Sequence, residues 1–281
     1  MHRPFALAVL LLVAGQGLAQ STDGFLDVFD KLAKEKGVAI PTTIEKKAFE
    51  FVPIVKKGQP VTFKMGSEKG ADDEKPVHEV TLTRPFEMQR TEVTQFQYFL
   101  VMMKNPSYFR KKNTNRPVEM VSYDDAKKFI TKLNELDPRH TYMLPTEAQW
   151  EYAARGGTVT EYFFGDDVSK LKGHAWFKDN SGEQTHDVAT APNPKVDPQN
   201  KFGLYDMAGD VWEWISDRYG EKYYSSLDNF TDPEGPKTGD DRVLRGGSWN
   251  FDATNCRSSS RFHNPGSKFY SYGFRLVRTA K

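Results

Sequence analysis

The chain has 281 residues, of which 38% are hydrophobic, 13% aromatic and 27% charged, an ordinary composition for a soluble globular protein. A formal net charge of +1 argues against a general binder of nucleic acid or of anionic membranes. Five Trp, twelve Tyr and twenty Phe supply enough apolar side-chain area for a sizeable core without long helices.

The first residues predict a targeting segment. The run MHRPFALAVLLLVAGQGLAQ has a basic residue, Arg3, followed by an apolar stretch that is too short to cross a bilayer. Gly17 and Ala19 are small residues at the positions that precede a signal-peptidase cleavage site, so we expect residues 1–19 to be a signal peptide. A buried N-terminal helix is the alternative interpretation. The sequence thus predicts a periplasmic or secreted protein, and no other segment suits a membrane span.

Residues 20–47 predict a short helix followed by a linker. One helical face is indicated by apolar residues at the i, i+3, i+4 and i+7 spacing, namely Phe25, Val28, Phe29 and Leu32. The main domain is expected to occupy residues 48–281. It begins with short apolar runs that predict strands within residues 49–54, 60–67 and 80–94.

Three helices are predicted from capping residues and helical periodicity. They follow a Ser or Thr that suits an N-cap, and they cover residues 95–103 after Thr94, 123–136 after Ser122 and 147–155 after Thr146. The second helix has one apolar face, formed by Ala126, Phe129, Ile130 and Leu133. Asn105–Pro106 is expected to end the first helix, and Gly156 the third. Beyond residue 157 periodicity nearly disappears, and the many aromatic residues there indicate packed irregular structure with short strands.

Nine motifs give the chain a resemblance to one family. In chain order they are FKMGS, KPVHEVTL, TEVTQFQYFL, RPVEMVSYDDAKKF, YMLPTEAQWEYAARGG, FGLYDMAGDVWEW, VLRGGSW, NCRSSSR and YGFRLVR. The series is similar to that of the formylglycine-generating enzymes, also called sulfatase-modifying factors. The resemblance implies an α+β domain with low regular secondary structure, the formylglycine-generating-enzyme fold, which is C-type-lectin-like. The founding activity of that family oxidises a sulfatase cysteine to formylglycine with molecular oxygen and copper.

The copper chemistry implied by the resemblance needs two thiolates after the Gly-Gly-Ser motif, because Cu(I) is a soft ion. The family places them three and eight residues after the serine. Counted from Ser248, those positions hold Phe251 and Cys256, and Cys256 is the chain's one cysteine. The sequence therefore argues against copper as a cofactor.

Three interpretations of Cys256 stay open at this point. It is a small buried side chain, as free cysteines commonly are, or a reactive thiol whose pKa a neighbouring Arg257 lowers, or part of a metal site. The resemblance makes Cys256, Ser248 and Trp214 the candidate catalytic residues, with Arg257 and Arg261 in the same pocket region. The alternative is structural: Trp214 fills the core, and the arginines brace loops.

The segment GLYDMAGDVWEW resembles a calcium loop of the family. Carboxylates of Asp210 and Glu213 would be joined there by the backbone carbonyls of Ala208, Gly209 and Val211, since calcium takes six to eight oxygen ligands. In the alternative interpretation Asp210 caps a turn and Glu213 pairs with an arginine. The expected calcium is structural.

A second family calcium site corresponds to the segment FKDNSGEQTHDV, where Asn180 and Asp187 are the candidate ligands. The six histidines show no HExxH spacing, which removes support for a metal hydrolase.

These observations predict an exported family member without the two-cysteine copper oxidase activity. Its first expected role is a binding or assembly module that presents a cleft to a polypeptide or glycan of the cell envelope. The alternative is an oxidoreductase of the same family, either similar to the siderophore-tailoring relatives or a formylglycine-generating oxidase with an altered site. The sequence itself names no substrate.

Overall fold

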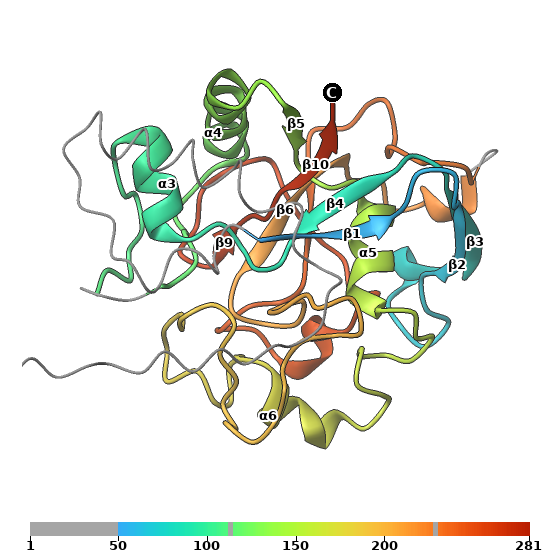
Figure 1. Ribbon diagram of the computed structural model, residues 1–281. Coiled ribbons are helices and arrows are strands. Elements are labelled where there is room, and N and C mark those ends of the chain that lie inside the picture. The colour runs from blue at the N-terminus through green and yellow to red at the C-terminus, as the bar shows by residue number, and fades with distance from the viewer. Residues whose placement is uncertain (1–49, 112–114, 227–229) are drawn as a thin grey trace, which may run out of the picture.

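The computed structural model describes residues 50–111, 115–226 and 230–281, which form short helices and strands joined by long packed loops (Figure 1). The expected signal peptide over residues 1–19 and the helix and linker over residues 20–47 lie outside the described residues. The predicted α+β class and the low content of regular secondary structure are confirmed.

A four-stranded antiparallel sheet joins early and late parts of the domain. Its order is β1-β4-β10-β5, with β1 (Phe51–Val55), β4 (Phe86–Gln89), β10 (Val277–Ala280) and β5 (His140–Met143). The last strand therefore lies between two strands that come much earlier in the sequence, and Figure 1 shows it in red beside β4 and β5.

A separate antiparallel hairpin is formed by β2 (Val61–Met65) and β3 (His78–Leu82). The single strand-like run predicted over residues 80–94 is wrong as one element. Its first residues belong to β3, its middle to β4, and its end, Thr94, caps the following helix.

The second sheet has the order β8-β7-β6-β9. Its strands are β6 (Trp212–Arg218), β7 (Arg242–Arg245), β8 (Phe262–Asn264) and β9 (Tyr272–Gly273). Only the β6–β9 pair among them is parallel. Side chains alternate between the two faces of a strand, and both faces of β6 are covered. Trp212, Trp214 and the intervening Glu213 are consequently all buried, so Glu213 needs a partner inside the protein.

The three predicted helices are α3 (Gln95–Met102), α4 (Tyr123–Leu136) and α5 (Glu147–Arg155). Each predicted N-cap is confirmed, because the side chains of Thr94, Ser122 and Thr146 accept from the amide three residues later. α3 ends before Asn105–Pro106, where Met103 adopts a left-handed conformation with φ 56°. Gly156 ends α5 as predicted, in the same left-handed region.

The predicted apolar face of α4 is confirmed as part of the main core. Its buried residues are Ala126, Phe129, Ile130 and Leu133. The Phe129 ring stacks on Tyr98 with centroids 5.4 Å apart and meets the edge of Phe274 at 5.3 Å. These contacts attach α3, α4 and the C-terminal segment to one another.

Residues 157–211 contain little regular structure beyond the short α6 (Leu171–His174) and one 3-10 turn. In this region side chains form hydrogen bonds with backbone amides and carbonyls that would otherwise pair within a sheet. Asn200 donates to the carbonyl of Ala153 at 2.6 Å and accepts from the amides of Phe202 and Leu204 at 3.0 and 3.3 Å. The irregular packed region expected from the sequence is thus held by specific hydrogen bonds.

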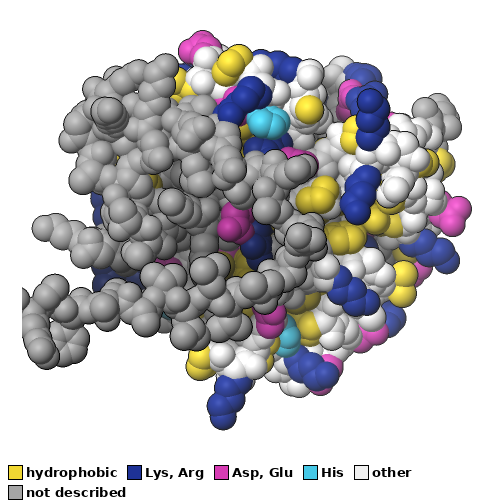
Figure 2. Space-filling view, viewed as in Figure 1, with side chains coloured by type: hydrophobic (Ala, Val, Ile, Leu, Met, Phe, Trp, Pro, Cys, Tyr) yellow, Lys and Arg dark blue, Asp and Glu magenta, His cyan; other side chains and the backbone are white. Residues whose placement is uncertain are grey.

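The surface carries both signs of charge. On the face in Figure 2, acidic and basic side chains are interspersed over the described part of the molecule. Within the three described stretches, no helix combines the length and the apolar character needed to cross a bilayer.

Candidate functional site

The Gly-Gly-Ser segment packs directly on Cys256. Gly247 has φ 79°, and a Cβ at this position would lie 2.7 Å from the sulfur of Cys256. A side chain larger than hydrogen is therefore excluded unless the cysteine moves. The Gly-Gly-Ser segment and the turn that carries Cys256 therefore fit closely against each other.

Cys256 is a buried side chain with 1% of its surface exposed. It packs in a small apolar cluster that includes Tyr162, Leu171 and Phe177. Burial raises the pKa of its thiol to about 12, so the sulfur is protonated at neutral pH. The expectation that Arg257 lowers this pKa is wrong, because Arg257 is directed to carboxylates instead.

Phe251 occupies the position at which the oxidase subgroup is expected to carry its first thiol. Its ring lies against the core, with its centroid 5.4 Å from that of Trp212 and 5.5 Å from that of Phe262. This is a packing role, and it places no soft ligand near Cys256.

Ser248 and Trp214, the other candidate catalytic residues, are also fully buried. The hydroxyl of Ser248 donates to the side-chain oxygen of Asn250 at 2.8 Å, so its partner is an amide and not a general base. The indole of Trp214 donates to the carbonyl of Val121 at 3.0 Å within the main core. The structure does not bring these two residues into a common cavity with Cys256.

Arg257 and Arg261 form ion pairs that brace loops. Arg257 donates to both oxygens of Glu74, at 2.6 and 2.7 Å. Arg261 donates to both oxygens of Glu147, at 2.7 and 3.0 Å. Bidentate pairs of this kind are specific and strong when buried, and they fix the turn that follows Cys256 to distant parts of the chain.

The proposed calcium loop fits a cation only in part. Asp210 accepts from the amide of His186 at 3.0 Å, while its second carboxylate oxygen is buried without a hydrogen-bond partner. Glu213 is not free, because its two oxygens accept from Arg275 at 2.7 Å each and from the Trp150 indole at 2.8 Å. Glu213 therefore pairs with an arginine, as the alternative interpretation expects.

The backbone of this loop is buried too. Ala208, Gly209 and Val211 lie in the interior, and Gly209 has φ 83° with its Cα so close to Trp176 that a Cβ would lie 2.2 Å from the Trp176 carbonyl oxygen. Within the described ranges no group of three or more His, Cys, Asp and Glu side chains is arranged to hold a metal ion.

The candidates for the second calcium site have separate structural partners. Asn180 accepts from the amide of Phe177 at 2.8 Å and donates to the carbonyl of Ala175 at 2.9 Å. Asp187 accepts from the amide of Asn115 at 3.0 Å. Asn180 thus stabilises its own turn, and Asp187 holds its loop to the segment at Asn115.

A cluster of buried carboxyl groups surrounds the predicted calcium loop, and the sequence analysis did not identify this cluster. Burial raises the pKa of Asp206 to about 6. Burial and then the charge of Asp206 raise the pKa values of Glu92 and Asp210 well above their usual range. Both carboxylate oxygens of Glu92 lack a hydrogen-bond partner among the described residues. Burial therefore disfavours the charged form of each of these acids.

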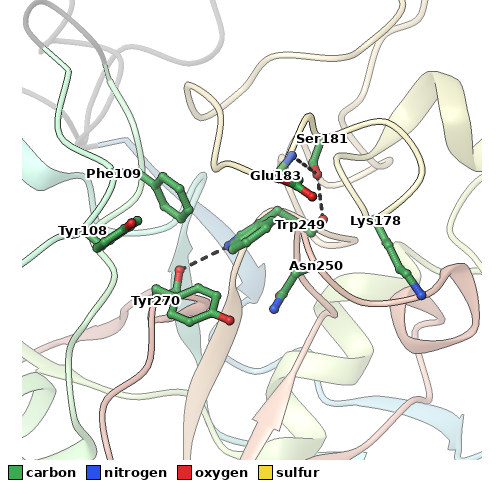
Figure 3. Close-up of a pocket in the computed structure, with 8 residues that line it drawn as sticks. All are labelled: Tyr108, Phe109, Lys178, Ser181, Glu183, Trp249, Asn250 and Tyr270. Atoms are coloured by element: carbon green, nitrogen blue, oxygen red, sulfur yellow. Dashed lines mark hydrogen bonds between the residues drawn. The ribbon is translucent and has the colours of Figure 1, made fainter.

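A cavity of about 650 Å³ opens beside the Gly-Gly-Ser segment (Figure 3). Its lining residues are Tyr108, Phe109, Lys178, Ser181, Glu183, Trp249, Asn250 and Tyr270. None of the candidate catalytic residues lines it. Figure 3 shows Tyr108 and Phe109 on one side and Lys178 on the other, with Trp249 and Tyr270 between them.

Hydrogen bonds fix the centre of this cavity. The Trp249 indole donates to the carbonyl of Tyr270 at 3.2 Å, and Ser181 donates to the carbonyl of Trp249 at 2.8 Å. The amide of Glu183 in turn donates to the hydroxyl of Ser181 at 3.2 Å. The Phe109 ring meets Trp249 nearly at a right angle, with centroids 5.1 Å apart. The aromatic lining is thus positioned before any ligand arrives.

The cavity draws on four distant segments, which explains why the sequence did not predict it. The loop after α3 supplies two aromatic residues, and the irregular region supplies three residues between 178 and 183. Trp249 and Asn250 follow β7, and Tyr270 precedes β9. The one available signal is composition, since SYF and KFYSYGF place several aromatic residues in loops.

The chain matches the family model of the sulfatase-modifying factor enzyme 1-like domain over residues 49–280. The formylglycine-generating enzyme of Streptomyces coelicolor is 38% identical to it over 178 residues, which are 59% of this chain and 54% of the enzyme. Serine/threonine-protein kinase pkn1 of Chlamydia caviae is 30% identical over 245 residues, which are 78% of this chain and 37% of the kinase. The chain thus spans only part of the length of these relatives.

Two solved structures share the fold. Treponema denticola variable protein 1 has a TM-score of 0.71 at 30% identity, covering 85% of this chain and 99% of that chain. PvdO from Pseudomonas aeruginosa has a TM-score of 0.69 at 25% identity, covering 86% and 99%. The formylglycine-generating-enzyme fold, with its C-type-lectin-like α+β character, is confirmed as the architecture.

Proposed function

The chain belongs to the sulfatase-modifying factor enzyme 1-like family, and from this premise we propose that it is an exported binding or assembly module. Its aromatic cavity receives a polypeptide or a glycan of the cell envelope, in the periplasm or outside the cell. Family membership alone does not assign this role, since one fold supports several functions. The argument therefore depends on the chemistry of the cavity.

The observation that carries the proposal is the composition of the lining. Four aromatic residues and four polar ones surround the space, and neither a cysteine nor a histidine is among them. Cys256 is a protonated thiol in an apolar cluster, and Phe251 occupies the place of the first thiol. A preformed cavity that combines aromatic and polar groups in this way suits binding without covalent chemistry.

Aromatic side chains also give such a cavity most of its affinity. Tyr and Trp lose little conformational entropy on binding and bury a large area, so they dominate recognition surfaces. Tyr108 is 71% exposed at the rim, which leaves its ring free to cover a ligand, whereas Trp249 is 8% exposed and forms the floor.

The proposal is tested by screening the purified protein on a peptide array and a glycan array. Tyr108→Ala removes an exposed ring without disturbing the core, and Val159→Ala is the matched control, because Val159 is 80% exposed and lies outside the lining. We expect binders on one array that Tyr108→Ala weakens by about tenfold or more and that the control retains. Binding that ignores Tyr108→Ala contradicts the proposed site.

Calcium enters the proposal as a structural ion, and Asp210 is the side chain that would hold it. When bound, the ion supplies positive charge to the buried carboxyl cluster. The second carboxylate oxygen of Asp210, which has no hydrogen-bond partner among the described residues, supports this placement. Glu213 stabilises the loop through Arg275 instead.

The alternative function is an oxidoreductase of the same family, and the likeness to formylglycine-generating enzymes favours it. The burial of the thiol and the absence of a second cysteine count against that reading for this chain. Incubation with a sulfatase-type cysteine peptide, with and without copper, distinguishes the two functions.

A further inference from the structure

We propose that the cavity recognises a cationic side chain, lysine or arginine, presented by a polypeptide. The inference rests on the proposed binding function and narrows it to one class of ligand. It is carried by three features of the lining: an unpaired carboxylate, exposed aromatic faces and a free amide donor.

The first feature is the charge balance of the lining. Glu183 and Lys178 are its charged residues. The ammonium of Lys178 forms an exposed ion pair with Asp252, whose oxygen lies 3.0 Å away. The side chain of Glu183 is exposed and has no ion pair or hydrogen bond with any described residue. Lys178, Asp252 and Glu183 together carry one net negative charge, and the carboxylate of Glu183 is the one among them without an ion pair.

Two arginines near this region keep their positive charge, because the oxygen that each one contacts is neutral. Arg110 donates to the carbonyl of Ser107 at 2.6 Å, and Arg116 donates to the side chain of Gln184 at 2.8 Å. Neither belongs to the lining of the cavity.

The second feature is the arrangement of the aromatic rings. The faces of aromatic rings carry negative potential and attract cations within about 6 Å of the ring centroid. The ring centroids of Tyr108 and Tyr270 are 6.3 Å apart, so a cation between them lies within about 6 Å of both. Phe109 and Trp249 extend the same wall (Figure 3).

The third feature distinguishes a polypeptide from a free organic cation. The side-chain oxygen of Asn250 accepts from Ser248, which leaves its NH2 group without a partner among the described residues. An amide donor beside the aromatic wall matches a backbone carbonyl next to the cationic residue. A calcium ion is not the occupant, since it needs six to eight oxygens and the lining offers one free carboxylate.

The test compares two pairs of probes that share shape and differ in charge. Nα-acetylargininamide is matched by Nα-acetylcitrullinamide, and Nα-acetyllysinamide by its Nε-acetylated form. Binding to the full chain is measured by calorimetry at low and physiological salt. We expect each charged probe to bind at least about tenfold more tightly than its neutral partner, with a smaller ratio at higher salt.

Variants of the cavity test which side chains cause the preference for charged probes. Glu183→Gln should bring the ratio between charged and neutral probes close to one, and Tyr108→Leu should lower it while keeping an apolar surface. Glu79→Gln is the control, because Glu79 is an exposed carboxylate on β3 outside the cavity. It should leave the ratio unchanged.

The outcomes separate this inference from the broader proposal. Equal binding of charged and neutral peptides that Tyr108→Leu abolishes overturns the cationic specificity and leaves a polypeptide-binding cavity. Binding of oligosaccharides without any of the four probes also overturns it, and leaves a glycan-binding module. If no peptide or glycan binds, both proposals fail.

Discussion

The carboxylate of Glu119 accepts a hydrogen bond from the backbone amide of Phe109 at 2.9 Å. This contact ties a fully buried acid to the loop that brings Tyr108 and Phe109 to the cavity. Burial raises the pKa of Glu119 to about 7, although the amides of that loop and the charges of Arg110 and Arg116 act in the opposite direction. The aromatic wall therefore depends on a group that titrates near neutral pH.

A pH-dependent stability follows for Glu119. Its folded pKa of about 7 lies above the ordinary value of 4.5, so between these pH values the folded state keeps a proton that the unfolded state releases. The stability contributed by this group falls as pH rises through that window and is constant above it. Relative to Glu119→Gln, the free energy of unfolding of the unmodified protein should fall by up to about 3 kcal/mol from pH 4.5 to 8.

Urea unfolding of both proteins across this range measures the difference. Burial also raises the pKa of Asp217 to about 7, but this residue is present in both proteins, so its contribution cancels in the difference between their free energies of unfolding. A difference that does not change with pH would falsify the role of Glu119.

Replacement of Cys256 tests its burial. Cys256→Ser should lower the free energy of unfolding by about 1–3 kcal/mol, since the cluster around the sulfur offers the new hydroxyl few partners. Cys256→Ala is the control, because it removes the sulfur without adding a polar atom. Thiol reagents should modify the native protein only as fast as it unfolds. Rapid modification of the folded protein would restore the reactive-thiol interpretation.

Asp210 and Glu213 were both predicted as calcium ligands, but they have different partners in the structure. Glu213→Gln should cost about 3–5 kcal/mol with or without calcium, because it breaks a buried ion pair with Arg275. Calcium should raise the Tm of the unmodified protein, and Asp210→Asn should reduce that increase. Thermal melts with added calcium and with a chelator measure both effects. Identical melting curves under the two conditions would show that the carboxyl cluster is neutralised by protons alone.

Phe251 packs against the core at the position where the copper oxidases are expected to carry their first thiol. We expect no formylglycine on a sulfatase-type peptide, with or without copper, measured by mass spectrometry. Phe251→Cys should cost about 2–4 kcal/mol, because the ring packs against Trp212 and Phe262. Aldehyde formation that Cys256→Ser removes without unfolding the protein would overturn this prediction.

The signal peptide remains a prediction of the sequence. Intact-mass measurement on protein recovered from the periplasm or the medium should give a chain that begins at or near Gln20. A recovered chain that still contains Arg3 would contradict cleavage after Ala19.

Local patterns predicted the helices well, because capping and periodicity act within a few residues. Thr94, Ser122 and Thr146 each begin a helix as expected, and Gly156 ends one. The family motifs likewise predicted the architecture. The cavity and the carboxyl cluster depend on segments more than a hundred residues apart, such as Tyr108 and Tyr270. Spacing along the chain carries no direct signal for such contacts.

The place of β10 in the first sheet has a consequence for biosynthesis. A nascent chain that has not yet reached Val277 leaves β4 and β5 without the strand that lies between them. Their unpaired edges can bind other extended chains until that strand is made. The first sheet therefore closes only after translation of residues 277–280, the last strand to be made.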